Sequence, residues 1–229
     1  MKKYAVIVAG GAGLRMGASI PKQFLPLCGK PLLWHTLTAF LTAFDDLQVI
    51  LVLPESFVET GLAVVDDTTD PRRVQVTRGG STRFHSVKNG LDLVDKDSIV
   101  FVHDGVRCLV TPGLIRNCYT AALAKGSAVP AITAMDTIRI VTAAGSEQID
   151  RDAVRIIQTP QTFLSGIIKP AFEQAYLESF TDEASVVEAS GRPIHLVEGE
   201  ATNIKITRPM DLLVAEKILE NRELNRDNA

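Results

Sequence analysis

The residues best suited to chemistry lie near the start of the chain, in a glycine-rich stretch that carries two cations. Gly10, Gly11 and Gly13 follow a short apolar run, and Arg15 and Lys22 come after the glycines. Glycines let the backbone approach a ligand closely, and exposed N–H groups in such a turn bind anions. Arginine offers a fork of donors and lysine a mobile point charge. The stretch therefore predicts a binding site for nucleotide phosphates.

Spacing separates the glycine-loop chemistries that compete for this stretch. A Walker A loop needs a Gly-Lys pair five residues after an earlier glycine, and the sequence has no such pair. A dinucleotide fingerprint that starts at Gly11 would place its last glycine at Met16, but Gly17 comes one residue late. That fingerprint also needs an acidic residue about 20 positions on, whereas the first acidic residue is Asp45. Both observations count against an NAD(P)-binding oxidoreductase, which is kept as the alternative from a different functional class.

The charges of the chain favour a small polyanion as partner. The 229 residues have a formal net charge of −3, with 46% hydrophobic and 22% charged residues, which is typical of a soluble globular protein. A general nucleic-acid or membrane binder is therefore not expected. The first 44 residues nevertheless carry positive side chains and no negative ones. These are Lys2, Lys3, Arg15, Lys22 and Lys30.

The three cysteines predict a reducing compartment. Cys28, Cys108 and Cys118 are odd in number and include no CxxC pair, so they indicate neither a disulfide framework nor a zinc site. No apolar run approaches the length of a membrane span. We therefore expect a cytoplasmic protein.

Two further stretches of functional character follow predicted strands. Gly79, Gly80 and Ser81 come after a strand at 73–77, and Asp104 comes after an apolar strand that begins at Ser98. Ligands of open α/β sheets bind at the carboxyl ends of strands. A carboxylate that leaves an apolar strand at this edge is well placed to hold a metal ion. The sequence therefore predicts ligand binding at the second glycine turn and a functional role for Asp104.

The elements that must position these residues alternate between strand and helix. Short apolar runs and helical periodicity predict an α/β fold with a mostly parallel central sheet. Strands are predicted at 6–8, 48–53, 73–77, 98–102, 128–132, 194–198 and 203–206. Helices are predicted at 31–44, 55–66, 82–94, 112–125, 166–178 and 209–222, with a short capped helix after Thr181 and a frayed tail over 223–229.

One segment departs from this alternation. Residues 136–158 alternate polar and apolar side chains around Ala143 to Glu147, which predicts a two-stranded β arm. An isolated hairpin is marginal in water, so we expect the arm to pack on something large. A two-fold dimer is the commonest arrangement that would supply a surface.

The motifs, taken in order, resemble the IspD family, the 2-C-methyl-D-erythritol 4-phosphate cytidylyltransferases of the non-mevalonate isoprenoid pathway. The resemblance extends over nearly the whole chain. The matching motifs are Ala9-Gly10-Gly11-Ala12-Gly13-Leu14-Arg15-Met16-Gly17, Pro21-Lys22-Gln23-Phe24, Gly79-Gly80-Ser81-Thr82-Arg83, Val102-His103-Asp104-Gly105-Val106-Arg107, Thr159-Pro160-Gln161-Thr162-Phe163, Thr181-Asp182-Glu183-Ala184-Ser185 and Asn203-Ile204-Lys205-Ile206-Thr207-Arg208-Pro209.

The resemblance implies a fold, a reaction and a role for each matching residue. It implies one Rossmann-like nucleotidyltransferase sandwich over 1–229 with a protruding β arm at 136–158, a homodimer through that arm, and Mg²⁺-dependent transfer of CMP from CTP. The implied catalytic residues are Arg15, Lys22, Arg151 and Lys205. The implied nucleotide-binding residues are Ala9, Gly10, Gly11, Ala12, Gly13, Gly80, Ser81, Ser86 and Asp104, with Asp104 beside the metal. The implied residues for methylerythritol phosphate are Arg107, Thr137, Arg151 and Lys205, some of them from the partner's arm.

The sequence departs from the commonest family pattern at three places, which bears on the acceptor. Gly10 stands where alanine is frequent, Gly105-Val106 replaces an alanine pair, and Cys108 replaces a usual proline. The first change also occurs in ribitol-5-phosphate cytidylyltransferases, so that acceptor is the second hypothesis. A dimeric binding module without catalysis is a third, although it does not explain Arg15, Lys22 and Asp104.

Overall fold

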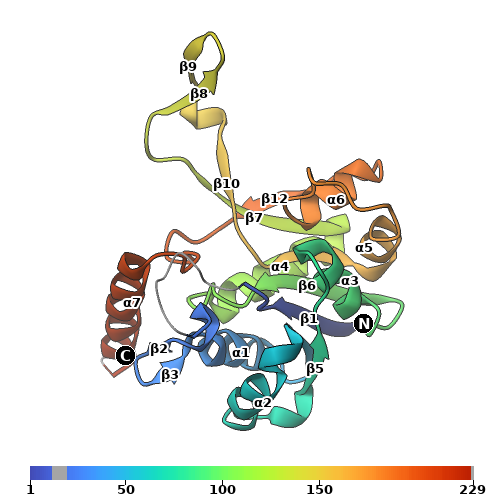
Figure 1. Ribbon diagram of the computed structural model, residues 1–229, viewed down its shortest axis with the longest axis vertical. Helices are drawn as coiled ribbons and strands as arrows, with labels where there is room; N and C mark the ends of the chain where they lie inside the picture. Colours follow the sequence, from blue (N-terminus) through green and yellow to red (C-terminus); the bar gives the residue numbers. More distant parts are fainter. Residues whose placement is uncertain (12–19, 228–229) are drawn as a thin grey trace.

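The central feature of the fold is an eight-stranded sheet with helices on both faces (Figure 1). A computed structural model describes residues 1–11 and 20–227. Within that part of the chain the strand order is β10-β7-β11-β6-β1-β4-β5, and β12 pairs with β7 outside this path. The predicted α/β fold with a mostly parallel sheet is confirmed.

The middle of the sheet is parallel and buried. The chain enters along β1 (Lys2–Val8), which pairs in parallel with β4 (Leu47–Leu53) and β6 (Ser98–Asp104); β4 in turn pairs with β5 (Val74–Arg78). Val8 lies opposite both Val52 and Asp104 in this register. The carboxyl ends of four strands therefore meet at one edge, as predicted.

The other half of the sheet mixes directions. Here β7 (Ser127–Thr133) pairs in parallel with β12 (Leu196–Glu198) and antiparallel with β10 (Arg155–Ile157). The sequence missed β11 (Gln161–Leu164), which lies antiparallel between β6 and β7.

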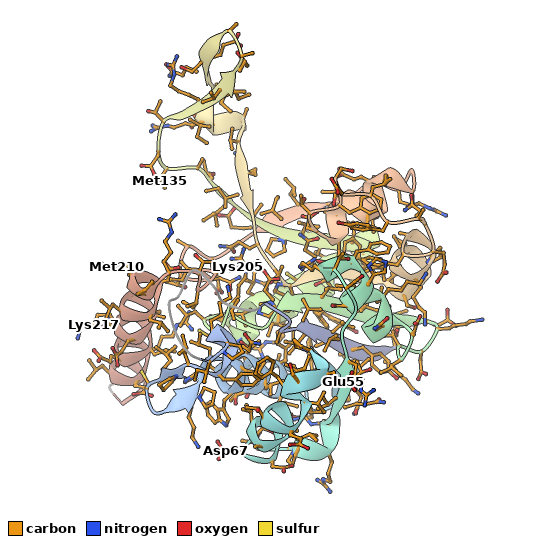
Figure 2. All side chains as sticks on the ribbon, viewed as in Figure 1. Glu55, Asp67, Met135, Lys205, Met210 and Lys217 are labelled. Atoms are coloured by element: carbon orange, nitrogen blue, oxygen red, sulfur yellow. The ribbon has the colours of Figure 1, made fainter. Side chains whose placement is uncertain are left out.

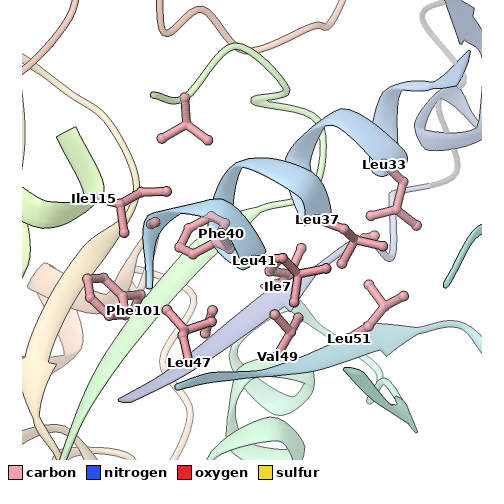
Figure 3. Packing of buried hydrophobic residues seen from close by; sticks show 14 of the residues in the cluster. Ile7, Leu33, Leu37, Phe40, Leu41, Leu47, Val49, Leu51, Phe101 and Ile115 are labelled. Carbon is pink, nitrogen blue, oxygen red and sulfur yellow. The ribbon is translucent and has the colours of Figure 1, made fainter. Parts of the chain in front are cut away.

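The helices cover both faces of the sheet, and alternate residues of β1 pack against helices on opposite faces. Ala5 and Ile7 belong to the cluster packed by α1 and α4, whereas Val6 and Val8 belong to the cluster packed by α3, α5 and α6. Figure 3 shows α1 lying over β1 and β4, with Leu37, Phe40 and Leu41 directed at the strands. Alternate residues of a strand face opposite sides, so a continuous apolar run serves both layers.

The helix bounds are as follows. They are α1 (Leu32–Ala43), α2 (Val58–Asp66), α3 (Arg83–Leu91), α4 (Pro112–Lys125), α5 (Ser165–Ala171), α6 (Glu183–Ala189) and α7 (Pro209–Asp227). The local sequence explains both ends of α4: Thr111 accepts a hydrogen bond from the Leu114 N–H, and Gly126 ends the helix at φ 89°.

The arm leaves the body as an antiparallel hairpin of β8 (Ile138–Thr142) and β9 (Gly145–Ile149), seen at the top of Figure 1. The predicted two-stranded arm is thus confirmed, with a correction at its end. Ile157 pairs with Ala131 of β7, so 155–157 belongs to the main sheet rather than to the hairpin.

Three predicted elements are wrong in extent or kind. The helix predicted at 166–178 ends at Ala171, and Phe172 turns inward to stack on Phe84 at 4.8 Å between ring centroids. The strand predicted at 203–206 is irregular, because its carbonyls accept side-chain donors instead of pairing with a strand. The predicted fraying is wrong for 223–227, which continue α7.

Two features complete the body. A small hairpin of β2 (Pro26–Leu27) and β3 (Lys30–Pro31) packs under α7, where Leu27, Val106 and Ala215 share a third apolar cluster. Among the described residues, no helix has the length and apolar character needed to cross a membrane.

Candidate functional site

A cavity of about 460 Å³ opens where the parallel strands end. A volume of this size lies within the range of small-molecule sites. Residues from both glycine turns, the end of β6 and the segment before α7 form its wall. The lining residues are Val8, Ala9, Gly10, Gly11, Lys22, Gln23, Val52, Pro54, Gly79, Gly80, Ser81, Thr82, Arg83, Ser86, Asp104, Val106 and Lys205.

The first glycine turn is held by backbone and side-chain hydrogen bonds. The Ala9 N–H donates to the Val52 carbonyl at 3.0 Å, and the buried Gln23 amide donates to the Ala9 carbonyl at 2.7 Å. Gly10 and Gly11 then reach the cavity wall. The predicted positions Ala12, Gly13 and Arg15 lie outside the described residues.

Lys22 enters the cavity from a short 3₁₀ turn, η2 (Lys22–Phe24), that follows Pro21. Its side chain is covered by protein, with 8% of the residue exposed. The Nζ atom donates to the Ile206 carbonyl at 3.0 Å, which ties the start of the chain to the segment before α7. A lysine fixed in this way presents its charge without first having to be ordered.

The second glycine turn is packed so closely that larger residues would not fit. A Cβ atom on Gly79 would lie 2.9 Å from Ser86 Oγ, and one on Gly80 would lie 2.4 Å from His85 Cβ. Instead the Gly80 N–H donates to Ser86 Oγ at 3.1 Å, and Thr82 caps α3 by accepting from the His85 N–H. The predicted residues Gly80, Ser81 and Ser86 all line the cavity.

Asp104 is the negative centre of the site. Its carboxylate lies 2.9 Å from Lys205 Nζ, 3.3 Å from Arg83 Nη2 and 3.6 Å from Arg107 Nε. Burial alone would raise the pKa of this carboxyl, but the charges of Arg83 and Lys205 outweigh burial and hold the pKa well below its ordinary value. Asp104 is therefore ionised throughout the physiological range of pH.

In the described lining of the cavity, Asp104 provides the single carboxylate for the predicted metal ion. Among the described residues, no group of three or more His, Cys, Asp or Glu side chains could hold a metal ion. Mg²⁺ commonly uses one or two protein carboxylates and takes its other ligands from water and substrate phosphates. The ionised carboxylate of Asp104 on the cavity wall fits this mode, with Lys205 as its competitor.

The two remaining cations near Asp104 differ in exposure. The Lys205 side chain is 41% exposed and lines the cavity, so it can turn towards a bound phosphate. The Arg107 side chain is largely buried and donates to the Asn203 carbonyl at 2.9 Å. Arg107 is not among the described residues that line the cavity; it supports Asp104 from behind.

Two of the predicted acceptor-binding residues lie elsewhere. Thr137 and Arg151 are exposed residues of the arm, and neither is among the described lining residues of the cavity. Arg151 Nη1 donates to the Met135 carbonyl at 3.1 Å within the arm itself. The chain therefore does not bring these residues to its own cavity.

Two residues that the structure places at the site had no predicted role. Gln23 holds the first glycine turn, and Arg83 pairs with Asp104. The available signal for Arg83 was its position directly after the second glycine turn, at the first position of a helix. Gln23 was visible as a polar residue beside Lys22, but its burial depends on the fold.

Comparisons with known proteins show the family to which the chain belongs. A family model described as IspD, 2-C-methyl-D-erythritol 4-phosphate cytidylyltransferase, matches residues 4–221. The curated protein of that name from Bacteroides thetaiotaomicron is 48% identical over 219 residues, covering 96% of this chain and 100% of the relative. The one from Phocaeicola vulgatus is 46% identical with the same coverage.

Solved structures give the same result. The 4-diphosphocytidyl-2C-methyl-D-erythritol synthase from Anaerococcus prevotii matches with a TM-score of 0.83 at 27% identity, covering 96% of each chain. The 2-C-methyl-D-erythritol 4-phosphate cytidylyltransferase from Thermus thermophilus matches with a TM-score of 0.76 at 34% identity, covering 95% of this chain and 98% of the other.

Proposed function

Because the chain belongs to the family of 2-C-methyl-D-erythritol 4-phosphate cytidylyltransferases, we propose that its cavity transfers CMP from CTP to 2-C-methyl-D-erythritol 4-phosphate. The products are 4-diphosphocytidyl-2-C-methyl-D-erythritol and pyrophosphate. The observation that carries the proposal is the meeting of Lys22, Asp104 and Lys205 with two glycine turns in one cavity. Family membership leaves the NAD(P)-binding alternative without support.

The two glycine turns are assigned to CTP. Backbone at Ala9, Gly10 and Gly11, together with Gly80, Ser81 and Ser86, would hold the cytosine and ribose. The support is that the described members of this set all line the cavity and that the Gly80 N–H and Ser86 hydroxyl are ordered there. Close backbone approach of this kind suits a flat base and a phosphate chain.

The reaction itself places demands on charge rather than on proton transfer. An oxygen of the acceptor phosphate bonds to the α-phosphorus of CTP as the bond to the pyrophosphate oxygen breaks. The attacking phosphate is already ionised, so a strong general base is not needed. Lys22 and Arg15 are assigned to the negative charge that develops on the phosphoryl oxygens and leaving group, and Lys205 to the acceptor phosphate.

Asp104 is assigned to the metal. It would hold the Mg²⁺ that, when bound, neutralises part of the phosphate charge. Arg107 orients Asp104 and the segment at Asn203, which carries Lys205 two residues later.

The arm is assigned to dimerisation and to the partner's site. Met135 and Val141 are each 82% exposed on the arm, and Met210 and Leu213 are exposed on α7. Figure 2 shows Met135 where the chain leaves for the arm, Met210 at the start of α7, and Lys205 in the body. Exposed apolar side chains on a protruding hairpin indicate a surface that another chain covers. A homodimer would bring Thr137 and Arg151 of one protomer to the cavity of its partner.

A cytoplasmic location is part of the same proposal. Cys28 is exposed and Cys108 and Cys118 are buried, all three as free thiols, which suits a reducing compartment. Fractionation of cells with a compartment marker would test this assignment.

An acceptor screen tests the proposed function. The protein is incubated with CTP, Mg²⁺ and one sugar phosphate at a time, and pyrophosphate release is measured. Release with methylerythritol phosphate and little with ribitol 5-phosphate is expected; the reverse would establish the ribitol alternative. ATP in place of CTP is the control for base selection. No release with any acceptor would leave the non-catalytic binding module as the better reading.

A further inference from the structure

A fully buried carboxylate lies directly behind the cavity wall. The Glu183 side chain has 0% exposure and forms a two-pronged ion pair with Arg83: Nη1 donates to Oε1, and Nη2 donates to Oε2 at 3.2 Å. A buried charge needs a partner of this quality, because its desolvation is costly. Neither residue has a role in the reaction described above, although both belong to motifs that the sequence shares with the family.

The position of Glu183 is fixed from several sides. Glu183 is the first residue of α6, whose cap is Asp182, with Ser185 completing a capping box. Gln161 of β11 donates to Asp182 at 2.7 Å and accepts from the Ala184 N–H at 2.7 Å. The contacts of β11 and the cap of α6 thus fix the start of the helix, and with it the position of the Glu183 carboxylate.

Arg83 links the fixed carboxylate of Glu183 to Asp104 in the cavity. The Nη2 atom that contacts Glu183 also lies 3.3 Å from Asp104 Oδ1, while Lys205 approaches the other oxygen, Oδ2. Burial alone would lower the pKa of Arg83, but the charges of Glu183 and Asp104 outweigh burial and raise it. Arg83 is therefore a permanent cation held at two carboxylates.

We propose that Glu183 is a positioning residue that holds the Arg83 guanidinium against Asp104 and so fixes the direction of the Asp104 carboxylate in the cavity. The inference rests on the proposed CMP transfer. Of the cations at Asp104, Arg83 is held by a second carboxylate, whereas Lys205 is half-exposed and contacts Asp104 from a flexible chain. The division leaves Lys205 free to turn to substrate phosphate while Asp104 keeps its orientation.

The direct test is Glu183→Gln, which keeps the shape of the side chain and removes its charge. Loss of an orienting partner of this kind is expected to lower kcat by about 10- to 100-fold. The KM for CTP should stay the same or fall, because the site gains net positive charge. A role in general packing would instead lower thermal stability with little change in kcat.

A double-mutant cycle asks whether Glu183 acts through Arg83. If it does, Glu183→Gln adds no further loss of kcat in a protein that already carries Arg83→Gln. Losses that add independently would overturn the proposal. Glu200→Gln is the matched control, because Glu200 is a partly buried carboxylate that accepts from Thr111 outside the cavity lining. This control should keep wild-type kcat. If Glu183→Gln does not fold, Arg83→Lys, which keeps the charge and loses the fork, takes its place with the same expected fall in kcat.

A measurement without substrate separates this inference from the proposed function. Nitrogen NMR of the wild-type protein should show slow rotation of the Arg83 guanidinium, and Glu183→Gln should release it. A freely rotating Arg83 in the wild type, or a folded Glu183→Gln protein with wild-type kcat, would overturn the inference. A wild type that releases no pyrophosphate contradicts the proposed function, and the NMR result still decides whether Glu183 holds Arg83.

Discussion

The cavity and the arm hold their charged residues in opposite ways. In the cavity, Lys22 and Asp104 are buried and Arg83 is partly buried, and each has a named partner within hydrogen-bond or ion-pair distance. On the arm, Thr137 and Arg151 are exposed, and Arg151 contacts its own hairpin. Charged groups that are held in place before substrate binds favour fast catalysis. The exposed side chains of the arm would be held in place only by contact with another surface. The described charges of the cavity are thus held within one chain, whereas the role proposed for the arm requires a partner.

The largest effect is expected at Lys22, a charge that is held in place before substrate binds. Its removal should lower kcat and leave the other contacts to the nucleotide intact. Lys22→Ala should lower kcat by about 100- to 1,000-fold, as the removal of one preorganised donor does at other sites of developing charge. Rapid-quench measurement of pyrophosphate release gives kcat, and calorimetry gives CTP affinity. A modest change in kcat with a large loss of CTP affinity would instead assign Lys22 to binding alone.

The next largest effect is expected at Arg151. Mixing two inactive variants shows whether Arg151 serves the cavity of its own chain or that of a partner. Arg151→Ala should lower activity by about 100-fold, the scale of a misplaced reacting group. If Arg151 serves the partner's cavity, mixing this variant with Lys22→Ala should restore part of the activity, because some mixed dimers contain one intact site. Arg155→Ala is the matched control, since Arg155 is an exposed arginine near the arm that contacts backbone carbonyls of 152 and 154. Absence of recovery in proven mixed dimers would contradict exchange of the arms.

A smaller effect is expected from the apolar surface of the arm. Val141→Asp should weaken dimerisation at least about 10-fold, because a charge replaces an exposed apolar contact at an interface. The fold of the protomer should not change, since Val141 is largely exposed within it. Light scattering over a concentration series measures the dimer, and circular dichroism checks the fold. Gln148→Asp, at another exposed arm position, is the control; equal weakening by both would point to charge rather than to an apolar contact.

The fold and much of the cavity could be predicted because they depend on short-range patterns. The strands β1 and β5 each lead directly into a glycine turn and β6 ends at Asp104, and neighbouring parallel strands must end at one edge. Asp104 and both glycine turns are therefore placed together by topology alone. Roles for Arg151 and Thr137 came from the family resemblance, and their predicted use by a partner stays untested.

What could not be predicted depends on contacts between distant segments. The strand β11 owes its pairing to the gap between β6 and β7, and four residues carry little pattern of their own. Residues 203–206 look like a strand, yet Arg107 and Lys22 take the carbonyls of Asn203 and Ile206. Arg83 and Glu183 are 100 positions apart and pair because α3 and α6 begin at the same edge.

The smallest effect is expected at His103, which lies between the Asp104 turn and the chain that returns from the arm. The buried His103 contacts the Arg107 carbonyl through Nε2 at 3.2 Å and the Thr159 hydroxyl through Nδ1 at 2.9 Å. A carbonyl can only accept, so Nε2 donates and Nδ1 accepts from Thr159, whose oxygen accepts the Asp104 N–H at 3.2 Å. The neutral ring thus connects the Asp104 turn to the chain that returns from the arm.

This connection should weaken in mild acid. Burial lowers the pKa of His103 to about 3, whereas an unfolded histidine titrates near its ordinary value of about 6.5. Below that value the unfolded chain binds more protons than the folded one, so the free energy of unfolding falls as the pH falls. Between pH 7.5 and 6 the His103 contribution amounts to about 0.8 kcal/mol. Urea unfolding at both pH values should show this difference in the wild type and lose it in His103→Gln, while His195→Gln, at a half-buried histidine, should keep it. An unchanged difference in His103→Gln would mean that other groups set the acid sensitivity, and that the turn and the root of the arm are not joined through His103.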